Sequence, residues 1–280
     1  MQNSVYVKIK RLKITRSQQE ETHFKVRPGI LRKTGLLPIV DMSQYKKTQI
    51  KIIILFLFSF SVFHVNSASG WDDETHLAIA KASEYSKWYY VVGPDIAKVK
   101  AGKIEIYNHF FDNSNNVEVV PEIIFEQAGR YNHPEDGEGH LYGAILASLR
   151  EYASRLKEKG AEYHMAYCAH YIADLSQPLH NIPYDDFNKE HHAENDGAAG
   201  EDVLHQISKI KKHMYRVNLR SDHFEEDLAK EIALIANKAR LLGYELKKGN
   251  RNLSKEETYI QLGQSASLFK AVLKHFSKVR

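Results

Sequence analysis

The chain has 280 residues, of which 43% are hydrophobic and 26% charged, so its composition is that of a globular protein and excludes a largely disordered chain. The formal charge of +4 is unevenly distributed, because residues 1–70 hold 12 of the 39 Lys and Arg but 3 of the 35 Asp and Glu. Residues 71–280 therefore carry 27 basic and 32 acidic side chains, a net −5, which argues against a nucleic-acid-binding protein that relies on a basic surface.

The N-terminal region contains the pattern of a secretory signal peptide. A lysine cluster over 46–51 precedes an apolar run over 52–63, and small residues follow up to Gly70. The apolar run is shorter than the roughly 20 residues that a membrane-spanning helix needs, although a retained signal anchor is the alternative. We expect cleavage between Gly70 and Trp71 and therefore a secreted or periplasmic protein.

Residues 1–41 are basic and show no hydrophobic pattern. Because signal peptides start at or near the initiator, we expect translation to begin at Met42 rather than Met1. Residues 1–41 are then an upstream misreading of the gene or, as the less favoured alternative, a basic extension. Residues 42–70 form the signal peptide, and residues 71–280 form one domain because no repeat or linker interrupts them.

Apolar residues three or four positions apart predict helices throughout the domain. The predicted helices cover residues 75–90, 141–156, 165–175, 224–242 and 259–276. Gly93 and Pro94 mark a turn, Gly160 ends the second of these helices, and Ser254 with Glu257 forms a capping box before the last. No sustained alternation typical of strands is present, so the sequence predicts an all-α fold, a single helical bundle whose core can hold a metal cluster.

Histidine is the most informative residue type in this domain. Residues 71–280 contain 13 of the 15 His but a single cysteine, Cys168, so no intrachain disulfide can stabilise the domain. An exported, histidine-rich domain without disulfides favours a metal-binding protein.

The most specific stretch is HYIADLSQPLHN, which begins at His170. His170 and Asp174 are four residues apart, so a helix places both on one face, where they can bind one ion. Pro178 cannot continue that helix, and it turns the chain so that His180 can reach a neighbouring position.

A second pair with the same spacing follows at His192 and Asp196. His191 with Asn195 is the alternative, but an amide is a weaker ligand than a carboxylate, and we therefore assign His192. One such pair is usual on a solvated helix face. Two pairs with a histidine between them favour a metal site.

With these residues the sequence resembles the zinc-dependent phospholipases C and the related single-strand-specific nucleases of fungi and plants. In that family the mature chain begins with a tryptophan whose amino group and carbonyl bind metal. A fixed order of His and Asp ligands follows. The matching positions are Trp71, His76, Asp95, His109, His170, Asp174, His180, His192 and Asp196.

The resemblance implies a helical fold of the phospholipase C and nuclease type with three zinc ions. The implied ligand sets are Asp95, His109, His170 and Asp174 for one ion, the Trp71 main chain, His76 and the other oxygen of Asp174 for a second, and His180, His192 and Asp196 for a third. Asp95 is the candidate catalytic residue that orients or deprotonates the attacking water. A carboxylate that bridges two ions suits phosphoryl displacement by a two-metal mechanism.

We therefore expect a zinc-dependent phosphodiester hydrolase that favours phospholipids, with nucleic acid as the alternative substrate. A non-catalytic zinc protein is less favoured, because structural zinc sites are normally closed by four protein ligands. The sequence implies a monomer with no stable protein partner and, at most, transient contact with a membrane surface. Phe110 and Phe111, beside His109, are expected in the core, or else against a base or an acyl-glycerol.

The remaining candidate side chains are assigned other roles. His133, Asp136 and His140 are expected to cap a helix or lie at the surface. Four further histidines on charged amphipathic stretches are expected to face solvent: His205, His213, His223 and His275.

Overall fold

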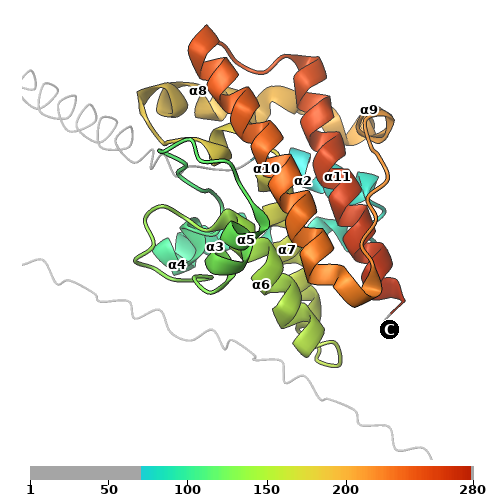
Figure 1. Ribbon diagram of the computed structural model, residues 1–280. Helices are drawn as coiled ribbons and strands as arrows, with labels where there is room; N and C mark the ends of the chain where they lie inside the picture. Colours follow the sequence, from blue (N-terminus) through green and yellow to red (C-terminus); the bar gives the residue numbers. More distant parts are fainter. Residues whose placement is uncertain (1–70, 279–280) are drawn as a thin grey trace, which may run out of the picture. The chain divides into compact units, whose positions relative to one another are not determined.

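The computed structural model describes residues 71–278. The expected start at Met42, the signal peptide and the cleavage after Gly70 concern residues outside this part. The described residues form helices and no strands, which confirms the all-α class (Figure 1). Within this part of the chain, no helix is both long and apolar enough to span a membrane.

The helices lie in chain order as follows. The α-helices are α2 (Asp73–Ala82), α3 (Gly93–Ala101), α4 (Lys103–Ile106), α5 (Pro121–Ala128), α6 (Leu141–Ser154), α7 (Ala161–Leu175), α8 (Asp186–Asp196), α9 (Ile207–Lys212), α10 (Phe224–Gly249) and α11 (Lys255–Ser277). Short 3₁₀ helices lie between them: η1 (Trp88–Tyr90), η2 (Pro178–Asn181), η3 (Gly197–Ala199), η4 (Val203–His205) and η5 (Ser221–His223).

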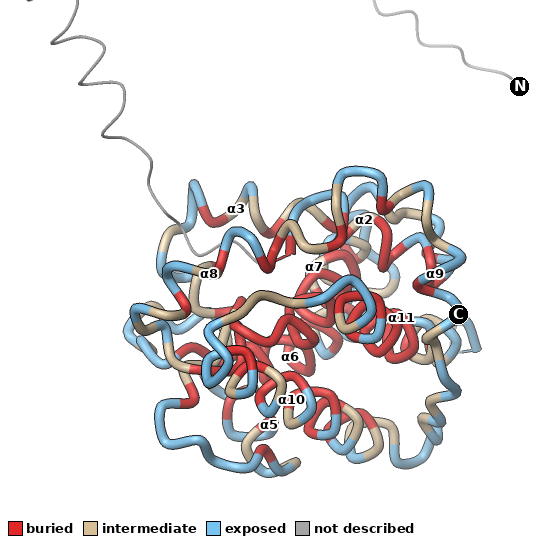
Figure 2. The backbone as a smooth tube through the Cα atoms, turned by 90° about the horizontal axis from the view of Figure 1, so that it is seen from above, coloured by how far each residue is buried: buried red, intermediate tan, exposed pale blue. Residues whose placement is uncertain are grey.

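Helix α7 lies in the middle of the bundle and packs against α2, α3, α6, α10 and α11. Its predicted apolar stripe of Met165, Cys168, Ile172 and Leu175 is buried. Figure 2 shows the buried backbone concentrated in α6, α7, α10 and α11, with exposed turns around them. Any polar side chain on α7 that faces its neighbours is therefore shielded from water.

Helices α10 and α11 cover the core as a long C-terminal pair (Figure 1). The predicted capping box of Ser254 and Glu257 is present at the start of α11. Gly243 lets α10 approach η2 closely, because a Cβ atom there would lie 2.8 Å from the carbonyl oxygen of Pro178. This close packing fixes the segment that carries His180.

Two helix boundaries differ from those predicted near the start of the domain. Helix α2 ends at Ala82 instead of continuing to Tyr90, and Glu84 adopts a left-handed conformation with φ of 66°. The Ser83 hydroxyl donates hydrogen bonds to main-chain carbonyls of α2 and α11, which anchors this end. Gly93 and Pro94 open α3 rather than forming a turn, since proline fits the first turn of a helix.

The boundary predicted at Gly160 was also wrong. Helix α6 ends at Ser154, and Gly160 is the residue that precedes α7. Leu156 packs on the core from the connecting loop, so it continues the apolar spacing without being helical. The apolar spacing thus correctly predicted that Leu156 contacts the core, but it did not predict where the helix ends.

Candidate metal centre

Helix α7 supplies the central residues of the site. His170 and Asp174 lie one turn apart on the same face, and both are fully buried. The His170 Nδ1 donates a hydrogen bond of 2.7 Å to the carbonyl oxygen of Val91. Its Nε2 is therefore the nitrogen that faces Asp174 Oδ2, at 3.3 Å.

The two carboxylate oxygens of Asp174 face different imidazoles. Oδ1 lies 3.1 Å from His76 Nε2 on α2. Oδ2 lies 2.8 Å from His109 Nδ1, which follows α4, and also faces His170. One carboxylate thus joins candidate ligand atoms from α2, α7 and the segment after α4. That Asp174 bridges two ions stays a prediction.

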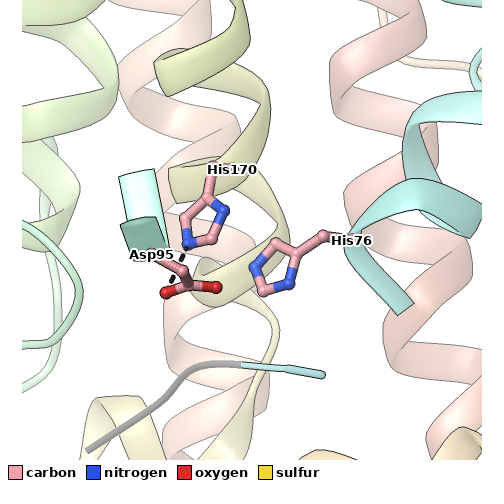
Figure 3. A group of neighbouring side chains, drawn as sticks. All are labelled: His76, Asp95 and His170. Carbon is pink, nitrogen blue, oxygen red and sulfur yellow. Dashed lines mark ion pairs between the residues drawn. The ribbon is translucent and has the colours of Figure 1, made fainter. Parts of the chain in front are cut away.

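Asp95 lies in the first turn of α3 and points toward the same cluster. Its Oδ1 is 3.6 Å from His170 Nε2 and 2.6 Å from Lys98 Nζ. Figure 3 shows His76, Asp95 and His170 converging, and the His76 and His170 rings stack with centroids 3.8 Å apart. The resemblance placed His76 with Trp71 and Asp174 alone, whereas the structure also brings it against the Asp95 and His170 pair.

A further group lies where η2 meets α8. Pro178 opens η2, as its predicted turn requires, and η2 carries His180. The His180 ring stacks with the ring of His192 at 5.2 Å, and His192 Nε2 lies 3.4 Å from Asp196 Oδ2. His191 instead faces Asn252, 2.6 Å from its Nδ1, so His192 is the histidine that joins this group.

Trp71 anchors the first described residues between α7 and α8. Its indole nitrogen donates a hydrogen bond of 3.0 Å to the carbonyl oxygen of Ala173, the residue before Asp174. The next amide, of Asp72, donates to the carbonyl oxygen of Asp196. This places the expected N-terminal residue beside the histidine groups. Metal binding by its amino group and carbonyl stays a prediction.

Each histidine in these groups has one ring nitrogen engaged by a main-chain carbonyl or by a side chain that belongs to none of the groups. The partners are the carbonyl oxygens of Asp72, Val91 and His109 for His76, His170 and His180, the carboxylate of Glu105 for His109, and the amide oxygen of Asn188 for His192. Metal-binding histidines normally have such partners, because they fix the ring and its tautomer. The second nitrogen of each ring is then the atom that could bind an ion.

Glu105 and Lys98 are site residues that the sequence analysis missed. Glu105 is buried on α4, where its Oε1 lies 3.0 Å from His109 Nε2 and accepts a hydrogen bond of 2.7 Å from the Tyr171 hydroxyl. Lys98 is a buried ammonium beside Asp95. Sequence spacing could have indicated both residues. Glu105 precedes His109 by four residues, and Lys98 follows Asp95 by three on the same helix.

The electrostatics of the cluster suit cation binding. Burial alone would raise the pKa of Asp174, but the facing His170 and His180 and the hydrogen bond with His109 hold it well below its usual range. Burial lowers the pKa of His180 to about 3, so its imidazole is neutral at pH 7 and able to bind metal. Burial raises the pKa of Asp196 well above its usual range despite the hydrogen bond from Gln177. A cation there would return Asp196 to its ionised form.

Among the described residues, three groups of buried or half-buried His and Asp side chains can hold metal ions, with ligand atoms within 4.8 Å of one another. The groups are His76 with Asp95 and His170, His109 with His170 and Asp174, and His180 with His192 and Asp196. Tetrahedral ligands about 2.0–2.1 Å from a zinc ion lie about 3.3 Å apart. The His109, His170 and Asp174 atoms, separated by 2.8 to 3.3 Å, fit that geometry.

The other histidines are more varied than expected. His133, His205 and His223 are exposed, but His213 and His275 are half-buried, and the His275 ring stacks on Phe224. His140 is fully buried, and no hydrogen bond from its side chain caps α6, so its expected surface or capping role was wrong. Its ring bridges Asp136 and Asn108, each 2.8 Å away. This polar network fixes the loop before α6.

A pocket of about 350 Å³ opens beside the metal groups. Three candidate ligands, His109, His180 and His192, line it together with apolar and aromatic side chains. The other lining residues are Ile106, Phe110, Asp112, Gly137, Leu179, Ile182, Tyr184 and Asn188. Phe110 thus faces the pocket, whereas Phe111 packs on the core against Tyr142.

Comparisons with known proteins identify no relative: no protein-family model, no curated protein and no solved structure matches the chain. The resemblance therefore rests on the order of the candidate ligand residues in the sequence.

Proposed function

We propose that the protein is an exported, zinc-dependent phosphodiester hydrolase that cleaves phospholipids in the manner of a phospholipase C. The observation that carries this proposal is the buried Asp174 carboxylate, whose two oxygens face His76 on one side and His109 with His170 on the other. A carboxylate in this position suits two ions about 3.5–4 Å apart, the spacing used in phosphodiester hydrolysis.

When bound, zinc would supply a water of lowered pKa and positions for the phosphate oxygens. The side chains of this chain supply orientation. Asp95 stays ionised, since His170 and Lys98 lower its pKa against the opposing effect of burial. So strongly ionised a carboxylate is a weak base, and we assign Asp95 mainly to orienting the attacking water. Lys98 holds the Asp95 carboxylate in place.

The pocket supports a phospholipid as substrate. Neither Lys nor Arg lines it, and Asp112 is its acidic lining residue. A nucleic-acid strand needs cationic contacts along several phosphates, whereas a phospholipid presents one phosphate with apolar and head-group portions. The net −5 of residues 71–280 agrees with this choice.

A single-strand-specific nuclease is the second candidate, and Phe110 and Tyr184 are the observation in its favour. Both rings line the pocket, and aromatic rings beside a phosphate site can stack nucleotide bases. Phosphocholine release from phosphatidylcholine vesicles is compared with acid-soluble release from single-stranded DNA, both with zinc. DNA cleavage without phosphocholine release, lost in Phe110→Ala, would assign the protein to the nucleases.

A non-catalytic zinc protein is tested with a soluble diester. We expect turnover of bis-p-nitrophenyl phosphate that a chelator abolishes and added zinc restores. Zinc binding without turnover of any of these diesters would contradict the proposal and leave a metal-binding role.

A further inference from the structure

Helix α3 turns two charged side chains inward and two apolar side chains outward, the reverse of what an ordinary surface helix does with such residues. Asp95 and Lys98 point into the protein, and Lys98 is buried. Ile96 and Val99 face outward, with 65% and 81% of their surface exposed. A surface helix normally buries its apolar residues and exposes its charges. The reversal therefore calls for a partner that covers the outer face.

The elements next to α3 in the chain also expose apolar residues. Helix α4 packs against α3 and exposes Ile104. Before α3, η1 exposes Tyr89 and Tyr90, whose rings contact each other. We name the outward residues Tyr89, Tyr90, Ile96, Val99 and Ile104 the α3–α4 face. Exposed apolar residues grouped on neighbouring elements can mark an interaction site.

The charges beside this face are basic. Lys100 and Lys103 are exposed at the end of α3 and the start of α4. In the described part of the chain, no ion pair engages either lysine. Exposed aliphatic side chains with flanking lysines and tyrosines are typical of segments that lie in the interface of an anionic bilayer. The lysines complement the negative charge of such a surface.

Helix α4 also connects this face with the pocket. Ile104 belongs to the α3–α4 face, Ile106 lines the pocket, and His109 three residues later is a candidate metal ligand. A lipid surface that contacts Ile104 would therefore contact a residue only two positions from a pocket-lining residue. Figure 1 shows α3 and α4 side by side, apart from the long helices α10 and α11.

We propose that the α3–α4 face is a membrane-docking surface that binds anionic bilayers and presents the pocket to lipid. The proposal rests on the proposed function for its choice of substrate, but binding itself needs no catalysis. It explains why α3 turns Asp95 and Lys98 toward the candidate metal groups and Ile96 and Val99 toward solvent.

The test uses the zinc-loaded protein, expressed from the full chain, and vesicles of phosphatidylcholine with phosphatidylserine. Val99→Asp combined with Ile104→Asp should lower the partition coefficient at least about tenfold, because it removes apolar contact and adds charges that the bilayer repels. Turnover of soluble bis-p-nitrophenyl phosphate should be unchanged. Leu241→Asp is the matched control, since Leu241 is 59% exposed but lies on α10.

The outcomes are distinct. Equal vesicle binding by the wild type and the double variant, or no binding by the wild type, would overturn the docking proposal. So would a wild-type dimer that Val99→Asp makes monomeric, because the face would then bind a second copy. Absence of soluble turnover in the zinc-loaded wild type would instead contradict the proposed function. If the double variant does not fold, Lys100→Glu with Lys103→Glu at exposed positions replaces it, with the same expected loss.

Discussion

Asp174→Asn is the sharpest test of the metal centre. Asp174 is fully buried, and its two oxygens face His76 at 3.1 Å and His109 at 2.8 Å. The amide replaces one oxygen by a nitrogen that cannot bind zinc, and it removes the negative charge that both ions would share. The variant should therefore lose two ions together and keep the one expected at His180, His192 and Asp196, as measured by elemental analysis.

The loss of stability can be worked from mass action. At free zinc about a hundredfold above the dissociation constant, each ion bound to the native state stabilises it by about 2.7 kcal/mol. Losing two ions removes about 5 kcal/mol, which for a domain of this size lowers Tm by about 10–20 °C. The assay is thermal unfolding with excess zinc and again with a chelator, which should remove most of the difference.

Asp136→Asn is the control for this experiment. Asp136 also pairs with a buried histidine, His140, but belongs to none of the metal groups of the described residues. Its effect on Tm should be the same with zinc and with chelator. If Asp174→Asn keeps its full zinc content, or if its Tm deficit is equally large with chelator, the bridging role of Asp174 is wrong.

Three further predictions follow from the geometry. The protein should be exported and begin at Trp71, as checked by intact mass. One added residue ahead of Trp71 should lower the zinc content, because a peptide nitrogen cannot replace a free amine. Full zinc content and activity with another N-terminus would contradict this. Glu105→Gln should weaken zinc binding about tenfold, because the carboxylate partner of His109 is lost. Circular dichroism should show that the fold is retained. An unchanged zinc affinity would show that Glu105 has no role in metal binding. In the zinc-free protein the pKa of His180 is about 3, whereas unfolding restores it to about 6.5. The unfolded chain therefore binds one more proton between these pH values, and the free energy of unfolding falls as pH drops from 6.5 to 3. His180→Gln should reduce this pH dependence by up to about 1.4 kcal/mol per pH unit, as measured by urea titrations at several pH values.

Much of the fold could be predicted because its helices bury one face. Met165, Cys168, Ile172 and Leu175 repeat at helical spacing, and the structure buries all of them. Helix ends were less predictable, because a tertiary contact decides them. The Ser83 hydroxyl binds a carbonyl oxygen of α11, far away in the sequence, and no local pattern records that contact.

The gathering of the candidate ligands could be predicted because their spacing is itself a constraint on geometry. Positions four residues apart place His170 with Asp174 and His192 with Asp196 on one helix face each, and the structure keeps both pairs. The same spacing applies to His191 with Asn195, so spacing alone did not distinguish His191 from His192. Asn252, which faces His191, comes from the segment after α10, and only tertiary structure brings it there.

The residues that orient the ligands were not predictable, and the reason is chemical. A side chain that binds zinc is normally His, Cys, Asp or Glu, so its identity restricts the sequence. A residue that only accepts a hydrogen bond from a histidine can be any carbonyl or amide oxygen, and here Val91 and His109 serve through the main chain. Glu105 is the exception that spacing could have revealed. Its carboxylate precedes His109 by four residues, and the turn after α4 brings the two side chains together, which gives the buried carboxylate a partner.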